Sequence, residues 1–205
     1  MPPSGTLRQV GWTVLVPLKN LASAKSRLRA GRPGDLDDHT ALVLAMAYAT
    51  VTAAGAAENV AEVVVVTADP LIRSALKATG ARYADDPGGG LNAALRSAAH
   101  DGAYVAALTG DVPALRPAEL TEALRYAGTR RCFVPDEPGT GTVLLAAPAG
   151  VPLEPRFGPD SARAHEVSGA FRLDGDWPTL RRDVDTAADL DRAVLLGWKA
   201  PAVRA

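Results

Sequence analysis

Three aspartates stand where they can bind a divalent cation. Asp111 follows the apolar run at residues 104–108 in the segment Thr109-Gly110-Asp111. Open α/β sheets keep their ligands at the carboxyl ends of buried strands, so this carboxylate is a candidate metal ligand. Asp183 and Asp185 alternate along an extended segment, which puts both carboxylates on one side of it. Because Mg²⁺ favours a few carboxylates together with water and phosphate oxygens, the three residues predict a magnesium site for nucleotide chemistry. The alternative is that each of them caps a neighbouring helix.

Three cations follow the first apolar run of the chain, namely Lys19, Lys25 and Arg27. Lysine ammonium groups are point charges and the arginine guanidinium is a planar group with several donors, so these side chains suit a triphosphate. A solvent-exposed basic helix face is the alternative explanation of the same pattern. The segment contains neither the P-loop pattern nor the glycine fingerprint of dinucleotide-binding folds.

Two glycine-rich segments can bring backbone amides close to a ligand. Gly90 ends a run of three glycines just before Asn92, where a base or a phosphate can approach a helix start. An ordinary linker with Asn92 as a helix cap is the alternative. The segment 139–142, Gly-Thr-Gly-Thr, and the segment 157–161, Phe-Gly-Pro-Asp-Ser, offer hydroxyls and free amides for an anion. Each segment alone is typical of an ordinary turn, but the presence of both favours an acidic second substrate.

The remaining reactive side chains are expected to be structural. His39, His100 and His165 lack metal-ligand spacing, so surface or capping roles are expected for them. Cys132 lies in an expected strand and suits the core better than a nucleophilic role. A single cysteine also forms no internal disulfide.

Composition narrows the class of protein. The chain has 205 residues, a net charge of −1 and 47% hydrophobic residues, which suits one domain with a core at about residues 12–197. The charge gives no argument for nucleic acid or a membrane surface, so a small-molecule substrate is expected. The first residues lack the regions of a signal peptide, and we therefore expect a cytoplasmic protein.

The elements that must position these groups alternate between strands and helices. Strands are expected at residues 12–18, 62–67, 81–84, 104–109, 132–135 and 142–147. Helices are expected at residues 35–54, 70–80, 91–100, 117–126, 161–167 and 187–196. This order predicts a three-layer α/β fold with a mostly parallel sheet and helices on both faces. The late strands favour a mixed sheet with an antiparallel edge or hairpin.

Six motifs in chain order resemble those of the phosphoenolpyruvate or 2-phospho-L-lactate guanylyltransferases, which make a precursor of the deazaflavin coenzyme F-420. The motifs are Val16-Pro17-Leu18-Lys19 with Ala24-Lys25-Ser26-Arg27-Leu28, Gly90-Leu91-Asn92-Ala93-Ala94, Gly110-Asp111-Val112-Pro113-Ala114-Leu115, Gly139-Thr140-Gly141-Thr142, Phe157-Gly158-Pro159-Asp160-Ser161 and Asp183-Val184-Asp185-Thr186. The first loop departs from the Leu-Ala-Gly-Gly opening of the molybdenum-cofactor guanylyltransferases, which argues against a molybdopterin substrate.

The resemblance implies a single nucleotidyltransferase domain of the glycosyltransferase-A-like, Rossmann-like type that uses GTP and Mg²⁺. It assigns the metal to Asp111, Asp183 and Asp185, and catalysis to Lys25 and Asp111. From the cation cluster and the glycine-rich helix start, we expect the nucleotide at Pro17, Lys19, Lys25, Arg27, Gly90 and Asn92. The resemblance assigns phosphoenolpyruvate to Thr142, Gly158 and Ser161. A partner transferase that consumes an unstable product is also implied.

The residues alone leave open both the identity of the acceptor substrate and two rival functions. They do not choose among phosphoenolpyruvate, 2-phospho-L-lactate and 3-phospho-D-glycerate, because small apolar differences between substrates are worth only about 1–3 kcal/mol. We favour phosphoenolpyruvate because the overall pattern looks closest to the actinobacterial branch of the family. The rivals are a nucleotidyltransferase that uses CTP or UTP and a nucleotide-sensing module without turnover.

Overall fold

The computed structural model describes residues 11–19, 21, 28, 36–100 and 102–199. Its strands are β1 (Trp12–Pro17), β2 (Val60–Val66), β3 (Arg82–Ala84), β4 (Val105–Leu108), β5 (Cys132–Pro135), β6 (Thr142–Ala147) and β7 (Phe171–Arg172). Its helices are α2 (Leu36–Gly55), α3 (Pro70–Ala75), the 3₁₀ helix η2 (Lys77–Thr79), α4 (Leu91–Ala98), α5 (Pro117–Tyr126), α6 (Ser161–Val167) and α7 (Ala187–Leu195). Among these helices, none combines the length and the hydropathy that crossing a membrane requires.

The strands form one sheet in the order β3-β2-β1-β4-β6-β5-β7. Only β6 runs antiparallel to its neighbours, while the other described pairs are parallel. The expected mostly parallel mixed sheet is confirmed, and β5 and β6 form the expected hairpin. The other option, an antiparallel edge, is wrong because β6 lies inside the sheet. Strand β7 was not expected, since its two residues are too few to show a period.

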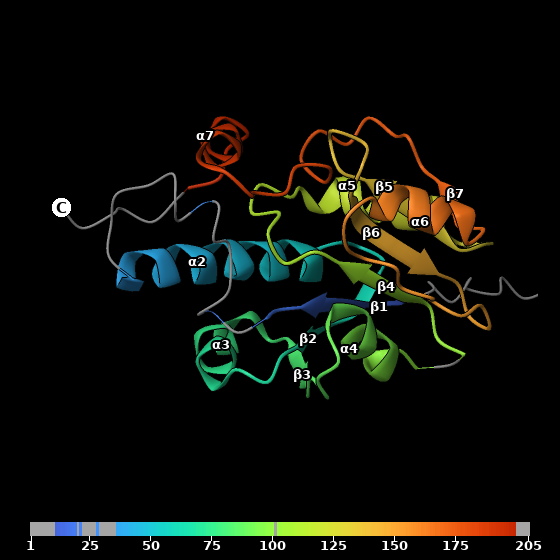
Figure 1. Ribbon diagram of the computed structural model, residues 1–205, viewed down its shortest axis with the longest axis horizontal. Coiled ribbons are helices and arrows are strands. Elements are labelled where there is room, and N and C mark those ends of the chain that lie inside the picture. Colours follow the sequence, from blue (N-terminus) through green and yellow to red (C-terminus); the bar gives the residue numbers. More distant parts are fainter. Residues whose placement is uncertain (1–10, 20, 22–27, 29–35, 101, 200–205) are drawn as a thin grey trace, which may run out of the picture.

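Helices cover both faces of the sheet, as Figure 1 shows. One core cluster joins alternate residues of β1, β2 and β4, including Val14 and Val16, to α2, α3 and α5. A second cluster joins strand residues of the opposite face, including Leu15 and Phe133, to α4 and α6. Because side chains alternate across a strand, the central apolar strands pack against both layers at once.

Helix α7 packs on α2 in a third apolar cluster. Leu42 and Met46 of α2 meet Leu190 and Ala193 of α7 there, together with Val184. The first turn of α7 is held by a capping box, in which the Thr186 side chain and the Asp189 side chain each bond the other's backbone. This packing sets the position of the chain just before α7.

Candidate active site at the carboxyl edge of the sheet

Three carboxylates from distant parts of the chain meet at the carboxyl edge of the sheet. One oxygen from each of Asp111, Asp183 and Asp185 can be chosen so that all three lie within 4.8 Å of one another. All three residues are half-buried. The backbone N–H of Val184, between the two later aspartates, donates to the Asp111 carbonyl oxygen at 3.0 Å. This bond ties the two acidic segments together.

Asp111 is positioned by close packing at the end of β4. The preceding Gly110 packs closely there, because a Cβ at that position would overlap the end of the Leu18 side chain. On the other side, the Val112 N–H donates to the buried Thr50 Oγ1 at 3.1 Å, and that hydroxyl donates to the Met46 carbonyl oxygen. Asp111 does not cap a helix, since α5 begins after Arg116.

The segment before Asp183 is held by a buried carboxylate of α5. Glu119 Oε2 accepts the backbone N–H groups of Thr179 and Leu180, both at 2.9 Å. Thr179 Oγ1 in turn accepts the Arg116 N–H at 2.9 Å. The capping explanation for Asp183 and Asp185 is wrong, because Thr186 is the N-cap of α7.

The donor set suits a hard divalent cation. Oxygen ligands around octahedral Mg²⁺ at about 2.1 Å lie about 3 Å apart when adjacent and about 4.2 Å apart when opposite. The three carboxylate oxygens lie within 4.8 Å of one another, so rotation of the aspartate side chains would bring them to these separations. Three ligands would also leave coordination positions for phosphate oxygens and water. The residues therefore fit Mg²⁺.

The start of β6 lies at the same edge because this strand runs antiparallel. The Thr109 N–H donates to the Val143 carbonyl oxygen at 3.0 Å, which places Thr142 beside the strand that leads to Asp111. The loop before it is closed by Asp136, whose Oδ1 accepts the Thr140 N–H at 2.9 Å. At Gly141, a Cβ would overlap the same Asp136 carboxylate.

Helix α6 joins this loop through its first turn. The Ala162 N–H donates to the Thr140 carbonyl oxygen at 3.0 Å, so Ser161 stands next to the loop that precedes Thr142. Ser161 is buried, whereas Gly158 is exposed and nothing lies within 4 Å of where its Cβ would be. Gly158 adopts a φ of +140°, which L side chains rarely adopt. Thr142, Gly158 and Ser161 thus come from neighbouring segments.

Sequence reasoning missed His165, because it assigned this histidine to the surface or to a cap. The ring is fully buried in α6 and lies 2.9 Å from Thr142 Oγ1 through Nδ1. Its burial and the nearby Arg131 and Arg156 lower the pKa of His165 to about 4. The available signal was its spacing: four residues after Ser161, the ring lies on the same face of the helix.

Asn92 spans two segments of the site instead of capping its helix. Its Nδ2 donates to the Phe157 carbonyl oxygen at 2.9 Å, and its Oδ1 accepts the Phe157 N–H at 2.8 Å. The N-cap of α4 is Gly90, with a φ of +90°. The cap alternative for Asn92 is therefore wrong. The side chain links the start of α4 to the segment that holds Gly158.

Only part of the expected cationic loop lies in the described residues. Pro17 ends β1, and Lys19 is exposed just beyond it. Lys25 and Arg27 lie outside the described residues. Two further cations, which sequence reasoning passed over, precede Asp183: Arg181 donates to the Pro135 and Asp136 carbonyl oxygens, and Arg182 pairs with Glu137 at 3.1 Å.

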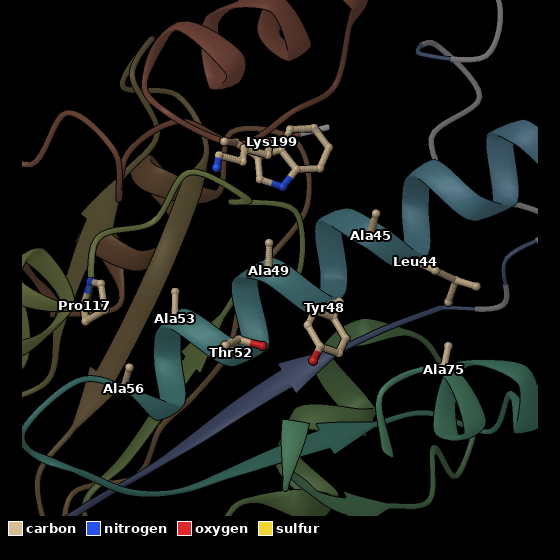
Figure 2. A pocket seen from close by; sticks show the side chains of 11 residues that line it. Leu44, Ala45, Tyr48, Ala49, Thr52, Ala53, Ala56, Ala75, Pro117 and Lys199 are labelled. Carbon is tan, nitrogen blue, oxygen red and sulfur yellow. The ribbon is translucent and has the colours of Figure 1, made fainter. Parts of the chain in front are cut away.

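A separate apolar groove of about 700 Å³ runs along the outer side of α2 (Figure 2). Its lining includes three alanines of α2, Ala45, Ala49 and Ala53, together with Tyr48 and Trp198. Such a surface lacks the density of charges and amides that binds a triphosphate, so we place the candidate site at the aspartates and not in this groove.

Comparisons with known proteins agree with this assignment of fold and chemistry. The model of the MobA-like NTP transferase domain matches residues 39–183. A solved structure of 4-diphosphocytidyl-2C-methyl-D-erythritol synthase superposes with a TM-score of 0.57 at 15% identity, covering 91% of this chain and 99% of that one. At that identity the likeness shows the fold alone.

Two relatives are much closer in sequence. Phosphoenolpyruvate guanylyltransferase from Salinispora arenicola is 57% identical over 192 residues, which cover 91% of this chain and 89% of the relative. The protein of the same name from Geodermatophilus obscurus is 51% identical over 193 residues, with the same coverage of both chains. The chain is therefore a nucleotidyltransferase that belongs to the MobA-like NTP transferase family and, within it, to the phosphoenolpyruvate guanylyltransferases.

Proposed function

We propose that this protein joins GTP to phosphoenolpyruvate, releasing pyrophosphate and forming enolpyruvyl-diphospho-guanosine. The observation that carries the proposal is the meeting of Asp111, Asp183 and Asp185 beside the Thr142 loop. The relatives named phosphoenolpyruvate guanylyltransferase support the choice of both substrates.

The reaction needs positioning and charge neutralisation more than a protein nucleophile. A phosphate oxygen of phosphoenolpyruvate attacks the α-phosphorus of GTP, a new P–O bond forms, and the bond to the leaving pyrophosphate breaks. The acceptor phosphate is already ionised near pH 7, so no base has to activate it. The protein contributes by holding two anionic groups in line and offsetting their charge.

Each group of site residues has a separate task in this proposal. Asp111, Asp183 and Asp185 would hold Mg²⁺, which when bound neutralises charge on the phosphate oxygens of both substrates. Pro17, Lys19, Lys25 and Arg27 would face the triphosphate, with Lys25 acting on the reacting phosphate. Gly90 and Asn92 would lie near the base or ribose. Because the Asn92 amide already binds the Phe157 backbone, its part would be to hold the Gly90 segment in place.

Thr142, Gly158 and Ser161 would bind the carboxylate or phosphate of the acceptor. The two hydroxyls offer donors, and the exposed Gly158 backbone allows close approach. An acceptor seated beside Thr142 would lie at the same edge of the sheet as Asp111, as an attack on a triphosphate bound at that edge requires.

We also propose the wider setting of this reaction. Residues 1–205 would form one nucleotidyltransferase domain, an assignment supported by the single sheet and the family match over residues 39–183. The enzyme would act in the cytoplasm in the biosynthesis of coenzyme F-420. A partner transferase would consume the product.

Mass spectrometry of the reaction product tests the proposal. The protein is incubated with Mg²⁺, GTP and phosphoenolpyruvate, 2-phospho-L-lactate or 3-phospho-D-glycerate in turn, with CTP and UTP replacing GTP in parallel. Because a phospholactate product is unstable, that reaction is also run with the partner enzyme present. We expect the guanylylated phosphoenolpyruvate and one pyrophosphate per product. GTP binding without pyrophosphate release would instead indicate a sensing module, and a product from CTP or UTP alone would indicate another transferase.

A further inference from the structure

The His165 ring is a polar group enclosed by aromatic side chains. Its centroid lies 5.9 Å from that of Phe133 and 5.2 Å from that of Phe157, and the residue is fully buried. In such surroundings each ring nitrogen needs a hydrogen-bond partner, because an unsatisfied buried polar atom is costly. Both nitrogens have one in the structure.

The partners decide where the ring carries its proton. The backbone N–H of Arg156 can only donate, and it points to Nε2 at 2.9 Å, so Nε2 must be the unprotonated nitrogen. The pKa of about 4 keeps the ring neutral near pH 7, with burial as the main cause and Arg131 and Arg156 as further causes. A neutral ring with a bare Nε2 carries its hydrogen on Nδ1.

That hydrogen sets the direction of the Thr142 hydroxyl. Nδ1 lies 2.9 Å from Thr142 Oγ1, and because Nδ1 carries a hydrogen, the hydroxyl oxygen must accept in this contact. The Ser161 backbone also hydrogen-bonds the ring. A hydroxyl that accepts from the ring cannot donate its own hydrogen back to it. Thr142, which is 6% exposed, therefore keeps its own hydrogen for a partner other than the ring.

We propose that His165 is a positioning residue for the acceptor site, where its Nδ1–H turns the Thr142 hydroxyl so that its hydrogen points to an anionic oxygen of the acceptor. This inference rests on the proposed function, since it needs the acceptor to bind beside Thr142. The opposite tautomer would let Thr142 donate to the ring and present a lone pair to the anion. The ring therefore favours an anion at this place without touching it.

Two substitutions at His165 separate its two hydrogen bonds. In His165→Asn, the side-chain amide nitrogen can take the place of Nδ1–H and donate to Thr142. In His165→Gln, the longer amide can take the place of Nε2 and accept from Arg156, while the donor to Thr142 is lost. Thr142→Val removes the hydroxyl, and Thr142→Ser keeps it as a matched control.

Pyrophosphate release is measured for these variants with phosphoenolpyruvate varied at saturating GTP, and with GTP varied. We expect Thr142→Val to raise the KM for the acceptor about ten- to a hundredfold, the range for a lost hydrogen bond to a charged ligand. We expect His165→Gln to raise it less, because the hydroxyl remains but is no longer oriented by the ring. The KM for GTP should stay within about twofold. His165→Asn keeps a donor to Thr142 and Thr142→Ser keeps the hydroxyl, so the acceptor KM of each should rise less than in His165→Gln and Thr142→Val, respectively. Adding His165→Gln to Thr142→Val should cause no further loss, because without the hydroxyl the ring has nothing to orient.

The outcomes distinguish this inference from the proposed function. A wild-type protein that gives no product with any of the three acceptors overturns both. An active wild type whose His165→Gln variant keeps its acceptor KM, or whose double variant is additive, overturns the role of His165 alone. Nitrogen NMR of the His165 ring gives a readout that needs no activity, and a hydrogen on Nε2 would overturn the inference directly.

Discussion

At the scale of single residues, the candidate site combines three half-buried aspartates with one histidine ring that is kept neutral. The three aspartates are half-buried and close together, as metal ligands must be. His165 is sealed among aromatic rings, and its environment disfavours the charged form. These opposite environments predict different responses to substitution and to pH.

Asp185→Asn should lower turnover about a hundredfold while the melting temperature stays close to that of wild type. The amide keeps the size of the side chain but removes a charge that balances the cation next to the reacting phosphates. Pyrophosphate release and thermal melting measure the two effects. Asp191→Asn, on the exposed side of α7, is the matched control and should keep full activity. Equal activity in both variants would exclude Asp185 from the mechanism.

His165 should make the protein less stable as the pH falls from 7 to 5. Its pKa is about 4 in the fold against 6.5 in the unfolded chain, so below pH 6.5 the unfolded state takes up a proton that the folded state does not. Stability is therefore lost between about pH 6.5 and pH 4, and this residue contributes about 2 kcal/mol of the change between pH 7 and pH 5. Denaturant unfolding at pH 7 and at pH 5 measures the free energy of unfolding. The difference between the two values should be about 2 kcal/mol smaller in His165→Asn than in wild type. The same pH dependence in both proteins would contradict the assignment.

At the scale of elements, the site depends on contacts that tie loops to helices. Glu119 in the first turn of α5 holds the chain before Asp183, and Asn92 in α4 holds the chain before Gly158. Glu119 accepts two backbone N–H groups, whereas Asn92 bonds both the N–H and the carbonyl oxygen of Phe157, and neither backbone segment belongs to a helix or strand. Removing such a side chain leaves buried N–H groups without a partner.

Glu119→Ala should lower the free energy of unfolding by about 1–3 kcal/mol, because the Thr179 and Leu180 N–H groups lose their acceptor. It should also raise the Mg²⁺ concentration needed for half-maximal activity, since the loop leading to Asp183 is no longer held. Glu119→Gln keeps an amide oxygen and should show a smaller change in both. Glu58→Gln, which alters an exposed ion pair with Arg125, is the control. An unchanged Mg²⁺ requirement in Glu119→Ala would show that the loop holds its position without this contact.

At the scale of the whole molecule, one sheet edge collects groups from both halves of the chain. The order of the strands places β4 beside β6, and the reversed direction of β6 brings the start of that strand to the end of β4. Helix α7, packed on α2, brings the later aspartates to the same place. Ligands bound at this edge would therefore connect elements that are far apart in the sequence.

Mg²⁺ with GTP should raise the melting temperature by about 5–10 °C at a hundredfold excess over the dissociation constant. A ligand at that excess stabilises the folded state by about 2.7 kcal/mol, and each kcal/mol shifts the midpoint by about 2–4 °C in a domain of this size. Thermal shift measurements with and without EDTA test the expectation. The shift should shrink when EDTA removes the metal and in Asp185→Asn. If GTP raises the melting temperature by the same amount in the presence of EDTA, nucleotide binding does not depend on a metal held by the aspartates.

Local pattern in the sequence was enough to predict most elements and the candidate metal ligands. The expected bounds of α5, β5, β6 and α6 agree with the structure, because Pro, Gly and apolar periodicity mark their ends within a few residues. The aspartates stood out because each follows or precedes such a marked element. These signals act over one or two turns of chain, and so a single sequence carries them.

Only the tertiary structure decided which groups meet. The partner of Asn92 is 65 residues away, and the partner of the His165 ring on β6 is 23 residues away. The inner position of β6 and the pairing of the two-residue β7 likewise arise from the sheet as a whole. Such contacts depend on the packing of helices on both faces, which no short stretch of sequence encodes. For the same reason a histidine that was expected at the surface or at a cap is buried against Thr142, next to the proposed acceptor site.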